Sequence, residues 1–139
     1  MAVEPLAAAG AARHATADER ERLRSLATRM RQLGEAGTLN AFLAADVEFH
    51  ALLLQACLNE MFTALTGVIA EVLAGRTEHG LMPKCRQPVA LDLHDQVANC
   101  VAAGEARGAE TAMRELVEKV RDAISTTRQP APAGDPDRW

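Results

Sequence analysis

The sequence predicts an all-α protein, folded as an antiparallel bundle of about six helices. Apolar residues, mainly the helix-forming alanine and leucine, make up 48% of the chain, whereas aromatic residues make up only 3% and tyrosine is absent. Apolar residues also recur every three or four positions, which is the spacing of one face of a helix. With 139 residues, the chain is long enough for one domain with a single core.

The first two helices are indicated by the residues at their ends. The Ala-rich stretch 3–13 is predicted to form a short helix. Thr16, followed three positions later by Glu19, is the capping-box pattern that begins a second helix. Gly34 and Gly37 are expected to end it, since glycine favours the left-handed conformation that follows many helices. The apolar face of this helix is predicted to contain Leu23, Leu26, Met30 and Leu33.

A third helix is predicted to begin at Thr38 and to carry two neighbouring stripes. One stripe contains Phe42, Ala45, Phe49, Leu52 and Ala56. The other contains Asp46, His50, Leu53 and Cys57. We therefore expect Asp46 and His50 to face inward. Both need polar partners there, because unpaired polar groups are costly to bury.

Two more helices follow in the second half of the chain. A fourth helix is predicted from Met61 to about Gly75, and residues 76–87 are predicted to form a loop because they contain glycine, proline and several charges. Pro88 is expected to open a fifth helix, since proline fits a first helical turn, and Gly104 to end it.

The last predicted helix spans 105–126, and a tail follows it over 127–139. The proline, alanine, glycine and aspartate content of this tail predicts disorder. We therefore expect one folded domain over 1–126.

Charge and cysteine content exclude several classes of protein. A net charge of −4 and a pI of about 5.5 argue against nucleic-acid binding by this chain alone. The arginines from Arg20 to Arg31 alternate with acids, which is typical of a solvated helix face. The separated cysteines Cys57, Cys85 and Cys100 indicate a reducing compartment. The sequence has neither a membrane-spanning apolar run nor a signal-peptide pattern, so we expect a cytoplasmic protein.

The candidate site residues lie on the third and fifth predicted helices. Asp46 and His50 are four positions apart, which places both side chains on one face, one turn apart. His94 falls on the apolar face of the fifth helix. One carboxylate and two imidazoles suit zinc, nickel or manganese, and leave positions open for water or an anionic small molecule. The same three residues could instead form a hydrogen-bonded core network, and their pattern alone does not decide between the two.

No other catalytic pattern is found. The sequence contains no phosphate-binding glycine loop and no nucleophile elbow. His14 and His79 are expected to face solvent, whereas Cys57 and Cys100 are expected to be small core residues.

Several short segments, in order along the chain, resemble one protein family. The most specific runs from Leu43 to Asn59 and reads L-x-x-D-x-x-F-H-x-x-L-x-x-A-x-x-N. The others are Val3-Glu4-Pro5 with residues 11–16, His94-x-x-Val97 with residues 102–105, and Ala109-x-x-Ala112-Met113-Arg114. From about Val3 to Ile124, the chain resembles the FadR C-terminal domain, or FCD domain, the ligand-sensing half of GntR-type bacterial transcription regulators.

The resemblance implies an effector-binding and dimerisation domain without enzymatic activity. A small organic acid would bind in a central cavity of the bundle. In many FCD domains an Asp and a His on one helix, with two further His, hold a divalent metal that helps to bind the carboxylate of the effector. Asp46, His50 and His94 match three of these ligands. Leu116 occupies the fourth position, which a water, an effector carboxylate or His79 would have to fill.

The resemblance also bears on partners. Arg76 has the fork geometry that suits a carboxylate, and Asn99 follows His94 on the same helix, so both are predicted effector contacts. We expect a homodimer. The winged helix-turn-helix that precedes this domain in such regulators is expected to be absent, because the chain starts at the sensing domain.

Two alternative functions stay open. One is a small helical-bundle metalloenzyme, although the Glu-x-x-His motifs of di-metal bundles are missing, and the other is a ligand-free helical interaction module.

Overall fold

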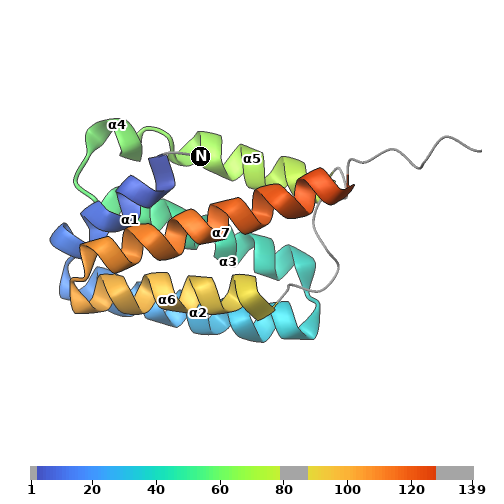
Figure 1. The fold of residues 1–139 in the computed structure, drawn as a ribbon, viewed down its shortest axis with the longest axis horizontal. Helices are drawn as coiled ribbons and strands as arrows, with labels where there is room; N and C mark the ends of the chain where they lie inside the picture. Colours follow the sequence, from blue (N-terminus) through green and yellow to red (C-terminus); the bar gives the residue numbers. More distant parts are fainter. Residues whose placement is uncertain (1–2, 79–87, 128–139) are drawn as a thin grey trace, which may run out of the picture.

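The computed structural model describes residues 3–78 and 88–127, with side chains over 3–75 and 88–122. The described part is entirely helical outside its turns, which confirms the predicted all-α fold (Figure 1). Its helices are α1 (Val3–His14), α2 (Ala17–Ala36), α3 (Leu39–Ala56), α4 (Glu60–Thr63), α5 (Thr66–Glu78), α6 (Pro88–Ala103) and α7 (Ala106–Thr127). Thr127, predicted as the first residue of the tail, is instead the last residue of α7, and residues 79–87 and 128–139 lie outside the described residues.

The start of α2 follows the local sequence signal. Thr16 Oγ1 accepts a hydrogen bond from Glu19 N at 3.1 Å, and Glu19 Oε1 accepts one from Thr16 N at 2.9 Å, so the predicted capping box is present. The helix ends at Gly37, whose φ of 71° is left-handed as predicted. Gly34 is instead a buried residue within α2, and Thr38 precedes α3 without its side chain capping it.

The predicted fourth helix is divided, and in this respect the prediction was wrong. Asn59 Oδ1 accepts hydrogen bonds from Met61 N at 3.0 Å and Phe62 N at 3.2 Å and so begins the short α4. Leu65 N then donates to Phe62 O, three residues back, which tightens the chain into a turn before α5 begins. The second segment, α5, continues past Gly75 to Glu78.

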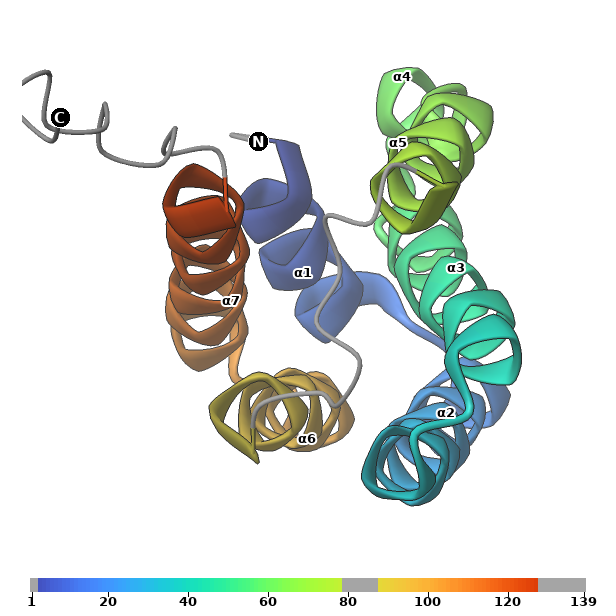
Figure 2. The ribbon, with the colours of Figure 1, turned by 90° about the vertical axis from the view of Figure 1, so that its right-hand side faces the viewer.

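The main core lies between α1, α2, α3, α6 and α7 (Figures 1 and 2). Its largest fully buried side chains include Phe42, Phe49, Leu23, Met30 and Met113. A smaller cluster joins α1, α3 and α5 through Ala7, Leu54, Cys57, Ile69 and Leu73. No helix in the described part of the chain is long and apolar enough to cross a membrane.

The first helix approaches α3 closely because its inward face is made of small residues. Ala7, Ala8, Ala11 and Ala12 are all buried. A Cβ added at Gly10 would lie only 2.9 Å from the Cβ of Cys57, so glycine permits this crossing. The close approach brings the first turn of α1 within reach of side chains on α3.

Two arginines that were expected on a solvated face tie helices together instead. Arg20 donates to the carbonyl oxygens of Ala15 at 3.0 Å and Ala12 at 3.1 Å, and also to that of Val101. Arg31 contacts two acids on α6, with Nη2 2.6 Å from an oxygen of Asp92 and Nε 2.9 Å from one of Asp95. Both arginines therefore link α2 to α6. The alternation of charges along α2 does not predict such contacts between helices.

Candidate metal centre

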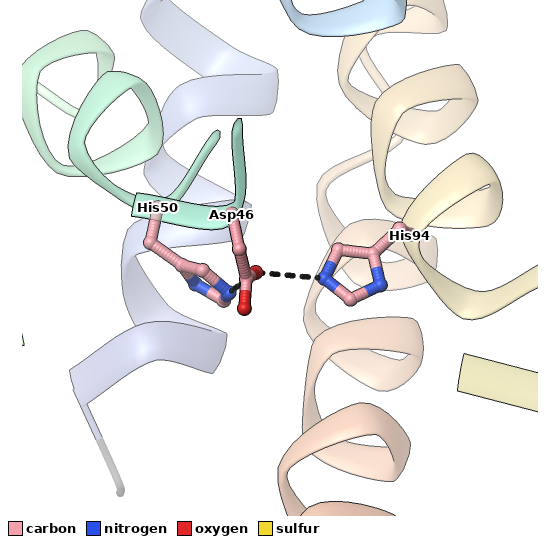
Figure 3. A group of neighbouring side chains, drawn as sticks. All are labelled: Asp46, His50 and His94. Atoms are coloured by element: carbon pink, nitrogen blue, oxygen red, sulfur yellow. Dashed lines mark hydrogen bonds and ion pairs between the residues drawn. The ribbon is translucent and has the colours of Figure 1, made fainter. Parts of the chain in front are cut away.

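Asp46, His50 and His94 meet inside the bundle, as the sequence predicts (Figure 3). Asp46 and His50 come from successive turns of α3, and His94 comes from α6. Their exposed fractions are 4%, 6% and 5%, so all three are buried. They lie among apolar residues because they share the helical periodicity of the stripes that build the core.

The donor atoms are arranged at distances that suit a metal ion. His50 Nε2 lies 3.1 Å from Asp46 Oδ1, and His94 Nε2 lies 3.3 Å from the same oxygen. One donor atom from each residue lies within 4.8 Å of the other two. Donors bound to one tetrahedral ion at about 2.0–2.1 Å are roughly 3.3 Å apart. The three residues therefore fit a shared divalent cation without a large rearrangement.

The outer nitrogen of each ring also faces an oxygen atom. His94 Nδ1 lies 2.7 Å from the carbonyl oxygen of Ala90, one turn earlier on α6. His50 Nδ1 lies 2.7 Å from Oε1 of Glu4, in the first turn of α1. The Glu4 contact is a close charge pair, but its N–H direction is outside the range of a regular hydrogen bond. Glu4 itself is largely buried, with 12% of its side chain exposed.

These contacts leave the two rings with more acceptors than protons. A neutral imidazole has one N–H donor and one lone pair. Here His50 and His94 each meet oxygen acceptors at both nitrogens. The set is balanced either by additional protons on the rings or by a cation shared between the inner nitrogens and Asp46. Two states therefore satisfy these acceptors: an ionised network with additional ring protons, and a metal-bound site with neutral rings.

In the absence of metal, the charges favour an ionised network. Burial raises the pKa of Asp46, but hydrogen bonds and charge interactions with His50 and His94 outweigh it and hold that pKa well below its usual range. Burial lowers the pKa of His50, yet the adjacent Glu4 and Asp46 carboxylates raise it to about 10. The pKa of Glu4 is lowered, because His50 outweighs the opposing effect of burial. A positive His50 then lies between two carboxylates.

Phe49 fixes the positions of both rings from the apolar side. It is fully buried, and its ring makes edge contacts with His50 and His94 at centroid distances of 5.7 and 5.1 Å. The sequence motif F-H therefore supplies a ligand candidate together with the side chain that packs against it.

The other predicted site residues lie elsewhere or outside the described side chains. Leu116 is buried in the main core, with an exposed fraction of 2%. Asn99 is exposed on α6, whereas the trio is buried. Arg76 lies in α5, but its side chain is outside the described part of the structure, as is His79. His14 is exposed, as predicted.

Sequence reasoning missed Glu4 as a neighbour of the site. Ala8 and Ala11, one and two turns further along α1, are both fully buried. Glu4 therefore stands on the inward face of this helix. That spacing was the available signal, although it does not identify His50 as the partner.

Residues 1–119 match the family model of the FCD domain. The chain belongs to the FCD domain family. The fold is similar to that of a solved structure, Streptococcus agalactiae GntR, which matches with a TM-score of 0.63 and 22% sequence identity. The match covers 91% of this chain and 53% of the other, so the FCD chain spans about half the length of that protein. A search of curated proteins finds no significant match.

Proposed function

We propose that this FCD domain binds a divalent metal ion through Asp46, His50 and His94 and uses the site to bind a small organic acid. The domain serves as the effector-binding part of a GntR-type transcription regulator. This proposal combines the membership of the FCD family, whose domains are regulatory, with the chemistry of the buried trio. We also propose that the domain forms a homodimer, that it is cytoplasmic, and that it acts as part of a complete transcription regulator.

The surplus of acceptors around His50 and His94 carries the proposal. Without a metal, these acceptors are paired only if the buried rings carry additional protons, and an unpaired buried polar group costs about 1–3 kcal/mol. In this site both Nε2 atoms converge on the same oxygen of Asp46. A cation between these three atoms would satisfy all of them, with each imidazole neutral and its remaining proton on Nδ1.

The donor set suits zinc, nickel or manganese, because it combines a carboxylate with imidazole nitrogens and contains no sulfur. The metal would supply a Lewis-acidic centre to which carboxylate oxygens can bind. Three protein ligands leave further positions open, and Leu116 adds no ligand where many FCD domains have a histidine. Arg76 and Asn99 remain proposed effector contacts, to be tested with the effector itself.

The two alternatives account less well for this site. A di-metal bundle enzyme needs several carboxylates and Glu-x-x-His motifs, whereas this sequence has no such motif. A ligand-free interaction module has no need for two imidazoles that are both oriented toward one buried carboxylate. We therefore favour a sensing role without catalysis.

Metal analysis tests the proposal directly. Purified protein, exposed to zinc, nickel or manganese and then desalted, should contain about one ion per chain. His50→Ala should lose the ion, whereas His14→Ala, at an exposed histidine, should keep it. Small mono- and dicarboxylates should then raise the melting temperature of the loaded wild type more than that of His50→Ala. A wild-type protein without metal would refute the metal site, and the absence of any carboxylate effect would refute the proposed effector class.

A further inference from the structure

The Glu4 carboxylate has no evident structural reason to be buried. An acid in the first turn of a helix is favourable because of the helix dipole, but an exposed side chain gains the same benefit. Glu4 instead turns inward, and 12% of its side chain remains exposed. A buried carboxylate requires a charged or hydrogen-bonding partner, which here is Nδ1 of His50 at 2.7 Å.

Each of the two rings, His50 and His94, lies between two oxygen atoms. Each ring directs Nε2 toward Oδ1 of Asp46, and each has an oxygen 2.7 Å from Nδ1. For His94 that oxygen belongs to the Ala90 carbonyl, and for His50 it belongs to Glu4. An acceptor at Nδ1 keeps the proton on that nitrogen and leaves the lone pair of Nε2 for a metal. Oε1 of Glu4 thus lies as close to Nδ1 of His50 as the Ala90 carbonyl lies to Nδ1 of His94, although the Glu4 contact is a charge pair rather than a regular hydrogen bond.

A carboxylate contributes a charge that the carbonyl does not. Asp46 and Glu4 together carry two negative charges when both imidazoles are neutral. A divalent ion bound at Nε2 of His50 would balance that charge, whereas a monovalent ion would leave an excess negative charge in a buried site.

We infer that Glu4 is a positioning residue for metal binding: it orients His50 and holds its proton on Nδ1, so that Nε2 binds a divalent cation. The inference rests on the proposed metal site and adds a residue from α1, which no motif in the sequence connects with His50. The metal site thereby depends on three helices, α1, α3 and α6.

The test compares Glu4→Gln with the matched control Glu48→Gln, which removes an exposed acid from α3. Zinc affinity is measured on the 139-residue chain by competition with a chromophoric chelator, and the absorption spectrum of the cobalt-loaded protein reports the ligand field. Glu4→Gln should weaken zinc binding roughly 10- to 100-fold and alter the cobalt spectrum. Glu48→Gln should change neither, and Glu4→Asp should recover part of the lost affinity.

Wild-type affinity and an unchanged cobalt spectrum in Glu4→Gln would overturn the positioning role while leaving the metal site intact. Failure of the wild type to bind zinc or cobalt would instead refute the proposed function, and the inference with it. If Glu4→Gln does not fold, nitrogen NMR of zinc-loaded wild type decides the question. His50 should be protonated at Nδ1 and bound through Nε2, and binding through Nδ1 would overturn the inference.

Discussion

Arg20 offers the clearest test of how this bundle is held together. Its guanidinium donates to carbonyl oxygens of Ala12 and Ala15, at the end of α1, and of Val101, in the last turn of α6. The carbonyls at a helix C-terminus have no partner within the helix and carry partial negative charge, so a cation there is doubly favourable. Replacing Arg20 by alanine removes the donors and the charge together.

The expected cost follows from these contacts. A hydrogen bond to a charged group contributes about 1.5–3 kcal/mol. Arg20 is only partly buried, so water can replace some of its bonds, and Val101 O also accepts from Gly104 N at 3.1 Å. We therefore expect Arg20→Ala to lower the free energy of unfolding by about 2–4 kcal/mol, less than the sum of three such bonds. For a domain of this size, the melting temperature should fall by roughly 10 °C.

Urea unfolding followed by circular dichroism measures this effect. Arg22→Ala is the matched control, because Arg22 is exposed on the same helix and should change stability by less than about 0.5 kcal/mol. Arg20→Lys should lose about half as much stability as Arg20→Ala, since a single ammonium cannot reach all three carbonyls at once. If Arg20→Ala is as stable as Arg22→Ala, the proposed tie between α1, α2 and α6 is refuted.

Two further predictions concern the polar site. Leu116→His should raise zinc affinity at least roughly tenfold if residue 116 adjoins the trio as the FCD pattern implies, and calorimetry without any gain would contradict that placement. Metal-free protein should be most stable between about pH 4.5 and 6.5 in urea unfolding with a chelator present. The pKa of His50 is raised from 6.5 to about 10, so its contribution is complete below pH 6.5 and is lost as the pH rises toward 10. The pKa values of Glu4 and Asp46 are lowered from 4.5 and 3.8, so their contributions to stability are lost as the pH falls below those values. An unchanged stability profile in His50→Gln would contradict the assignment of this pH dependence to the charged network around His50.

Features that depend on neighbours in sequence could be predicted. The capping box of Thr16 and Glu19 joins residues three positions apart, and it is present as expected. The inward position of Asp46 and His50 follows from the 3.6-residue period of one helix, which the surrounding phenylalanine and leucine residues reveal. His94 could be grouped with them because it falls on the apolar face of another helix of the same bundle, and the FCD pattern then supplies the pairing between the two helices.

Features that depend on how helices cross could not be predicted from local pattern. Arg20 and Val101 are 81 positions apart, and nothing in the alternating charges of α2 selects that carbonyl as a partner. Glu4 reaches His50 only because small residues on α1 allow a close crossing over α3. The break between α4 and α5 was missed for a different reason. The apolar residues around it fit one continuous helix as well as two, and the turn at Leu65 depends on a tight backbone hydrogen bond.

The polar trio is difficult to explain as a device for stability. An ionised carboxylate in a bundle interior loses its hydration, and exchanging buried charged groups for apolar ones of similar size is often neutral or stabilising. This bundle accommodates an apolar side chain at Leu116, where a fourth ligand is expected, so its core has no general need for polar groups. It nevertheless keeps Asp46 buried, with two imidazoles directed at one of its oxygens and both outer ring nitrogens held by further oxygens. A cation-binding sensor needs this arrangement, whereas an interaction module would be at least as stable without it.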